Sequence, residues 1–120
     1  MEIIATQACE FPAVEIRGRV DSGTAGSLQE RLGALVRGEA GGLIVDLSQV
    51  AHMSSAGFRA LLVVAKAGGD SGCPVALCGL STELQRLLTL SGFDEFFVIL
   101  PTREDCVAQL RARRAARSSQ

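Results

Sequence analysis

The sequence predicts a single α/β domain with a mixed, mostly parallel β-sheet and about four helices. The chain has 120 residues, about the length of one domain. Short apolar runs alternate with helical patterns in the order β-β-α-β-α-β-α-β-α, and such alternation implies crossovers onto a mostly parallel sheet. Hydrophobic residues make up 48% of the chain and the formal net charge is -1. This composition favours a folded core and argues against nucleic acid or a membrane surface as electrostatic partners.

Two β-type runs, residues 3–9 and 13–20, open the chain. In the second run Val14, Ile16 and Val20 alternate with charged residues, the period of a strand with one buried face. The tripeptide E-F-P separates the two runs. We therefore expect an antiparallel hairpin at the edge of the sheet.

The next segment, residues 21–38, predicts the first helix. Asp21, Ser22 or Thr24 can cap its N-terminus, and glycines between positions 38 and 42 end it. Its apolar stripe consists of Leu28, Leu32, Leu35 and Val36.

Three strand and helix pairs follow. The strands are predicted at residues 42–47, 73–80 and 96–100. The second helix presents Phe58, Leu61, Leu62 and Ala65 on one face, Ser81 opens the third helix, and Thr102 caps the fourth.

We expect residues 1–115 to form the domain and residues 116–120 to be a frayed tail. The four arginines near this end, Arg111, Arg113, Arg114 and Arg117, are interpreted as compensation of a helix dipole rather than as a nucleic-acid site. No apolar run approaches the ~18 residues that a transmembrane helix needs.

The cysteines and the single histidine predict no metal site or cofactor. Cys9, Cys73, Cys78 and Cys106 contain no C-x-x-C pair, and His52 is the only histidine. The N-terminus lacks the basic start and apolar core of a secretion signal. We therefore interpret the thiols as small, mostly buried apolar residues in a reducing cytoplasm.

Polar residues cluster in two segments that connect a predicted strand to the following helix. These segments are V-D-S-G-T and S-Q-V-A-H-M-S-S-A-G. Sites in parallel sheets cluster at the carboxyl ends of strands. One hydroxyl of Ser54 and Ser55 is expected to cap the following helix and stabilise it by ~1 kcal/mol. Gly57 costs roughly 1 kcal/mol relative to alanine inside a helix, which suggests close packing against its backbone. These residues alone leave both capping with packing and a functional role open.

A catalytic serine is the second interpretation, because S-A-G resembles the end of the hydrolase pattern G-x-S-x-G. Met53 stands where that strained turn needs its first glycine, and a triad histidine normally comes from a separate loop rather than from the adjacent His52. We therefore predict that the protein is not an enzyme.

A covalent switch is the third interpretation. A phosphoryl group on Ser55 adds about -1.5 to -2 charges. The free N–H groups and dipole of a helix N-terminus tolerate that charge, so the domain stays folded. A partner docked over the same surface meets new bulk and negative charge.

Three stretches, in order and at matching separations, resemble STAS domains, specifically bacterial anti-sigma factor antagonists. I-V-D-L-S-Q-V-A-H-M-S-S-A-G-F-R-A-L-L is similar to the family pattern of apolar residues, D-L-S, a spacer and D-S-S/T-G-L. R-G-R-V-D-S-G-T-A resembles the family's G-E-L-D-x-x-T/N-A, and L-L-T-L-S-G-F-D-E-F-F-V-I resembles its later segment. The similarity covers nearly the whole chain.

The resemblance implies partner switching. The unmodified antagonist binds an anti-sigma factor that is also a serine kinase and frees a sigma factor; the kinase then phosphorylates the antagonist, and a PP2C-type phosphatase resets the cycle. Aligning M-S-S-A-G on the family's M-D-S-S-G puts the phosphoacceptor at Ser55, with Ser54 as a rival because it replaces the usual acidic residue. Ala56 replaces the usual hydroxyl after the acceptor. The residues expected to contact the partner are Asp21, Ser22, Thr24, Met53, Ser54, Ala56, Gly57 and Phe58.

These considerations lead to a cytoplasmic regulator of transcription, monomeric or weakly dimeric, that is inactivated by phosphorylation. The alternative is a constitutive module, since some STAS domains serve as permanent subunits of signalling scaffolds or transporters. In that case the serine is only a helix cap.

Overall fold

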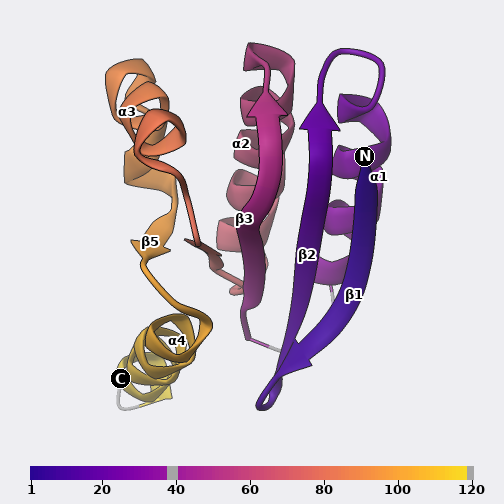
Figure 1. The fold of residues 1–120 in the computed structure, drawn as a ribbon. Coiled ribbons are helices and arrows are strands. Elements are labelled where there is room, and N and C mark those ends of the chain that lie inside the picture. Colours follow the sequence, from indigo (N-terminus) through magenta and orange to yellow (C-terminus); the bar gives the residue numbers. More distant parts are fainter. Residues whose placement is uncertain (38–40, 119–120) are drawn as a thin grey trace.

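The computed structural model describes residues 1–37 and 41–118 and forms one five-stranded sheet in the order β1-β2-β3-β4-β5 (Figure 1). β1 is antiparallel to β2, and all other neighbours are parallel. The predicted fold class and element order are confirmed. The strands are β1 (Glu2–Ala8), β2 (Phe11–Val20), β3 (Leu43–Met53), β4 (Val75–Cys78) and β5 (Val98–Leu100). The helices are α1 (Ala25–Val36), α2 (Ser55–Asp70), α3 (Thr82–Ser91) and α4 (Arg103–Ser118), with a short 3-10 helix, η1 (Phe93–Phe96).

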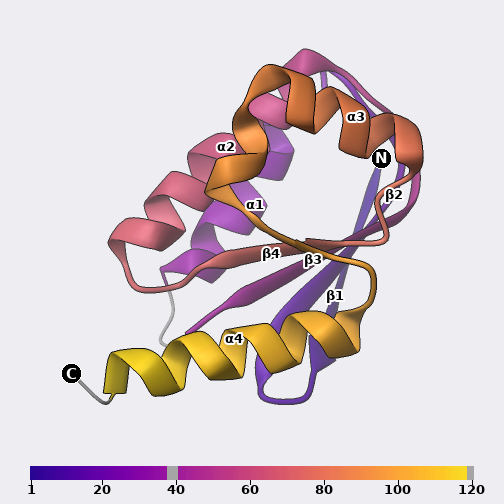
Figure 2. The same ribbon diagram turned by 90° about the vertical axis from the view of Figure 1, so that its left-hand side faces the viewer.

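Helices cover both faces of the sheet. Figure 2 shows α1, α2 and α3 on one side of the strands and α4 on the other. Each face has its own buried cluster, a larger one under α1–α3 and a smaller one under α4. β4 is buried along its whole length because it lies between the two layers.

Strand β3 is longer than predicted. The sequence indicated a strand at residues 42–47, but β3 continues to Met53, which pairs with Val20 at the end of β2. The added half carries exposed polar side chains, so a search for apolar runs misses it; backbone pairing with β2 extends it. His52 is exposed, as expected, but lies within this strand rather than in a loop.

Helix α4 continues to Ser118, through part of the segment predicted to fray from residue 116. The positions 119–120 lie outside the described residues. Arg111 and Arg114 bind Glu10 in the β1–β2 turn, with nitrogen–oxygen distances of 2.6 and 2.7 Å. Hydrogen bonds from Arg111, from the backbone and from Arg114 lower the pKa of Glu10 to about 2. Two of the terminal arginines thus tie α4 to the hairpin.

The predicted helix starts are largely confirmed. The Ser81 hydroxyl accepts a hydrogen bond from the Leu84 N–H at 3.1 Å, and the Thr102 hydroxyl accepts one from the Asp105 N–H at 3.1 Å. Gly92, with φ 76°, ends α3. The following η1 was not predicted, and it shortens the strand predicted at 96–100 to three residues. The end of α1 predicted at residues 38–42 lies partly outside the described residues.

Three of the four cysteines are buried, as predicted, and Cys9 is exposed. A hydrogen bond with Cys106, together with burial, raises the pKa of the Cys78 thiol. These thiols are therefore core residues in the reduced protein. Among the described helices, none combines the length and the apolar character that crossing a bilayer requires.

Candidate functional site

The two polar segments that connect a strand to the next helix lie side by side at the carboxyl ends of β2 and β3. β2 and β3 are parallel and end together, with Val20 opposite Met53 (Figure 1). The Ser54 N–H donates to the Val20 carbonyl at 2.8 Å, so the start of α2 is joined to the end of β2. The turn that begins at Asp21 is therefore next to the two serines.

This turn, residues 21–24, is held by its own hydrogen bonds. The Asp21 carboxylate accepts from the Gly23 N–H at 3.0 Å, and the Thr24 hydroxyl accepts from the Asp21 N–H at 3.0 Å. Thr24 occupies the N-cap position of α1, but its hydroxyl makes no cap bond within that helix. The carbonyl of Asp21 accepts from Ala25 instead. Asp21 and Ser22 are exposed, so a partner can reach this rigid turn.

The two serines have different tasks in the structure. Ser54 is the N-cap of α2, and its hydroxyl accepts a hydrogen bond from the Gly57 N–H at 3.4 Å. Ser55 is the first residue of the helix, and it is exposed. The prediction that one hydroxyl caps the helix is confirmed, and the capping residue is Ser54. The Ser55 hydroxyl is left at the surface.

Gly57 allows the first turn of α2 to rest directly on the sheet. A Cβ atom at this position would lie 2.7 Å from Met53 Cγ and 2.8 Å from Val20 Cγ1. The close packing that the glycine suggested is therefore present. Met53, Gly57 and Phe58 are buried, so of the predicted contact residues around α2 only Ser54 and Ala56 present a larger surface, beside the exposed Ser55.

The N-termini of α1 and α2 carry no acidic residue in the first turn, whereas α3 has Glu83 and α4 has Glu104 and Asp105. Unpaired N–H groups and the helix dipole give every helix start a partial positive charge. In α3 and α4 a carboxylate offsets that charge. In α2 it is available to an added anion.

A pocket of about 290 Å³ opens beside Ser55. Its wall comes partly from α3 and η1, which are distant in sequence from the serines. The lining residues are Met53, Ser55, Phe58, Arg59, Leu87, Ser91 and Phe93. Met53, Ser55 and Phe58 were predicted as site residues from the sequence, and the other four were not. The sequence does show four leucines in α3, and the structure buries only Leu84 and Leu88 of them.

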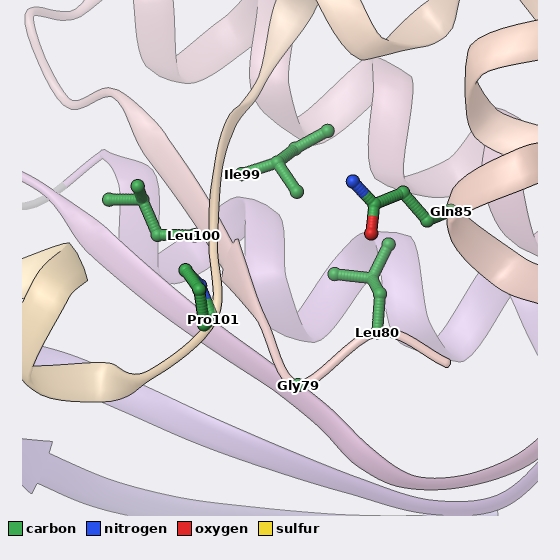
Figure 3. Close-up of a pocket in the computed structure, with 6 residues that line it drawn as sticks. All are labelled: Gly79, Leu80, Gln85, Ile99, Leu100 and Pro101. Carbon is green, nitrogen blue, oxygen red and sulfur yellow. The ribbon is translucent and has the colours of Figure 1, made fainter. Parts of the chain in front are cut away.

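A second pocket, of about 260 Å³, lies at the carboxyl ends of β4 and β5. Figure 3 shows the Gln85 side chain extending from α3 toward Ile99 and Leu80. Neither serine lines this pocket, and its lining residues, Gly79, Leu80, Gln85, Ile99, Leu100 and Pro101, carry no charge. It offers little chemistry for an anion or a metal.

Near this second pocket, Asp46 links three elements. Its carboxylate accepts from the Ser48 N–H at 2.9 Å and from Arg103 Nε at 3.1 Å, and Arg103 also donates to the Thr6 hydroxyl. Partial burial opposes ionisation, but the hydrogen bonds from Ser48 and Arg103 outweigh it and lower the pKa of Asp46. The carboxylate thus serves to fasten α4 to β3 and β1.

The chain is similar to known proteins in family, sequence and structure. The model of the STAS domain matches residues 2–106. Putative anti-sigma factor antagonist BtrV of Bordetella bronchiseptica is 30% identical over 96 residues, which cover 80% of this chain and 83% of that protein. Anti-sigma-F factor antagonist RsfB of Mycobacterium tuberculosis is 28% identical over 104 residues, covering 87% and 84%.

Solved structures share the fold. An anti-sigma factor antagonist from Mycobacterium paratuberculosis superposes with a TM-score of 0.81 at 24% identity, covering 92% of this chain and 93% of that one. SpoIIAA of Bacillus in the phosphorylated form gives 0.69 at 14% identity, covering 91% and 99%. A sulfate transporter family protein from Wolinella succinogenes gives 0.75 at 20% identity, covering 90% of each chain. The chain therefore belongs to the STAS domain family, and anti-sigma factor antagonists are among its relatives.

Proposed function

We propose that the protein is an anti-sigma factor antagonist that binds an anti-sigma factor with serine kinase activity and is switched off by phosphorylation of Ser55. The observation that carries this proposal is the exposed hydroxyl at the first residue of α2, on a helix start without an acidic residue. The names of the relatives BtrV and RsfB support the antagonist role. The scheme implies a cytoplasmic protein that acts as a monomer or weak dimer.

Ser55 is a better phosphoacceptor than Ser54. The Ser54 hydroxyl is half-buried and accepts the N-cap hydrogen bond of α2, so it is less accessible to a kinase than the exposed Ser55. Ser55 Oγ is exposed and can attack the γ-phosphorus of ATP on the partner; ADP leaves and the hydroxyl proton is released. The new phosphate then lies at the positive end of α2. Modification is therefore compatible with the intact fold.

Phosphorylation of Ser55 affects partner binding, although it leaves the fold intact. A partner that covers the turn at Asp21 and the start of α2 has Ser55 at the centre of its contact. A phosphate there adds bulk and about -1.5 to -2 charges that the partner must desolvate or repel. A PP2C-type phosphatase would hydrolyse the phosphoserine and restore binding. The solved phosphorylated form of SpoIIAA supports such a cycle for this fold.

The test is to incubate the protein with its anti-sigma factor and ATP, and to map the phosphate by peptide mass spectrometry. We expect phosphate on Ser55, release of the complex and no release for Ser55→Ala. Modification at neither Ser54 nor Ser55, with the complex still released by ATP, contradicts the proposed switch. Phosphate on Ser54 instead would show that the rival residue is the acceptor.

The second candidate is a constitutive scaffold or transporter-associated module, favoured by the shared fold with a sulfate transporter family protein. In that case Ser54 only caps α2, and Ser55 is not a switch. A stable complex that is insensitive to both ATP and Ser55→Asp would support this alternative.

A further inference from the structure

Exposed apolar side chains gather on α3 and η1. Leu87, Leu90 and Phe96 are 43%, 76% and 47% exposed. Only Leu84 and Leu88 of α3 are buried in the core, so Leu87 and Leu90 contribute little to core packing. Large apolar side chains that remain exposed close to one another often mark interaction sites. Of these residues, Leu87 also lines the pocket beside Ser55.

The size of this pocket favours an amino-acid side chain over a small-molecule ligand. Its volume of about 290 Å³ is below or at the lower limit of the ~300–1,000 Å³ typical of small-molecule sites. Met53, Phe58, Leu87 and Phe93 contribute most of an apolar lining. Protein interfaces commonly bury one such anchor in an apolar pocket.

Arg59 is the only charged residue among the described residues that line the pocket. It is exposed and lies four positions after Ser55 on α2, the spacing of neighbours on one helix face. The acidic residues of η1, Asp94 and Glu95, do not line the pocket. The charge at the pocket is therefore positive, and it favours a carboxylate on an occupant.

We propose that the pocket lined by Leu87 and Phe93 receives an apolar side chain of the anti-sigma factor, and that Arg59 pairs with a carboxylate beside that side chain. This inference rests on the proposed function and specifies how the partner is recognised. The turn at Asp21 forms the polar side of the contact, and α3 with η1 forms its apolar side.

The same geometry links recognition to release. A phosphate on Ser55 lies at the pocket and about one helical turn from Arg59. It competes with the partner's carboxylate for the guanidinium group while its charge disfavours an apolar side chain nearby. Both effects weaken the complex at the same place once Ser55 is phosphorylated.

The test is a calorimetric titration of the anti-sigma factor, purified from the source organism, against four variants of this protein. Each titration gives the Kd of one variant. We expect Leu87→Ser and Arg59→Glu each to raise Kd about tenfold or more. The matched controls are Val63→Ser, an exposed apolar residue of α2 outside the pocket, and Arg86→Glu, an exposed arginine of α3 outside the pocket. Each control should change Kd less than about threefold, and thermal unfolding should confirm that all four fold.

Unchanged affinity of Leu87→Ser and Arg59→Glu would overturn this inference while leaving the antagonist role intact. Equal weakening by the two controls would also overturn it, because the contact would then not centre on the pocket. If the wild-type protein does not bind the anti-sigma factor, the proposed function fails and this inference with it. Arg59→Gln adds a second readout: the salt dependence of Kd should decrease relative to wild type if the ion pair forms.

Discussion

Helices α2 and α3 begin with the same pattern, a pair of hydroxyl residues. Ser54 and Ser81 are the N-caps, and their hydroxyls accept from the residue three positions on at 3.4 and 3.1 Å. The second hydroxyl of each pair, Ser55 or Thr82, is exposed at the first helical residue. The N-cap hydrogen bonds alone therefore do not distinguish the start of α2 from the start of α3.

The residues around the two helix starts differ. The residue that donates to the cap is Gly57 in α2, which lets the backbone contact Val20 and Met53, and the buried Leu84 in α3. Helix α3 has Glu83 in its first turn, whereas α2 has no acid there. A hydroxyl pair therefore marks a helix start, and the neighbouring charge and contacts decide whether that start suits a phosphate switch.

The largest expected difference is in partner binding. Ser55→Asp should weaken binding to the anti-sigma factor about a hundredfold or more, since an uncompensated charge in an interface costs several kcal/mol. Thr82→Asp, the matched change on α3, should alter Kd less than about threefold. Calorimetric titration of both variants measures this. Equal losses would mean that the α2 start has no special place in the interface.

The next effect concerns the close packing of α2. Gly57→Ala should destabilise the protein by about 1–3 kcal/mol, because the new methyl overlaps Met53 and Val20. Gly69→Ala in the same helix meets open space and should change the free energy of unfolding by less than about 1 kcal/mol. Urea denaturation compares them. If both substitutions behave alike, the contact beneath Gly57 is not tight.

Removing either N-cap hydroxyl should lower the stability of the protein by a similar amount, and by less than Gly57→Ala does. Ser54→Ala and Ser81→Ala should each cost about 0.5–2 kcal/mol, with the smaller loss at Ser54 because its hydrogen bond is longer. Thermal unfolding of each variant provides the values. A Ser54→Ala variant with unchanged stability would indicate that this hydroxyl is not needed as a cap, and would strengthen it as a rival acceptor.

The smallest effect is electrostatic. Ser55→Asp should stabilise α2 by about 0.3–1 kcal/mol at low ionic strength, because the carboxylate interacts with an uncompensated helix dipole. Thr82→Asp should give less, since Glu83 already lies in the first turn of α3. Chemical denaturation at low and high salt resolves the difference. Loss of stability in Ser55→Asp would argue against a fold-compatible phosphate.

Much of the site followed from patterns near the serines. The spacing of M-S-S-A-G after an apolar strand predicted a helix start, a cap and close packing at the glycine, and each is present. Leu87, Ser91 and Phe93 were missed because a linear pattern does not tell which helix lies beside the serines, and Arg59 was missed because an exposed charge on α2 gives no sign of the pocket that it lines. The second half of β3 was missed because backbone pairing, rather than apolar side chains, defines it.

The α/β class, the element order and the family resemblance could be predicted from the sequence, because hydrophobic period, turn residues and motif spacing are local properties of the chain. The folded structure shows which serine caps α2 and which is free at the surface, because the bond from the Ser54 N–H to the Val20 carbonyl joins the helix start to β2. It also places the apolar side chains of α3 and η1 beside that surface, where they form a pocket together with Arg59. These features depend on contacts between segments far apart in the chain, and such contacts form only when the helices pack on the sheet.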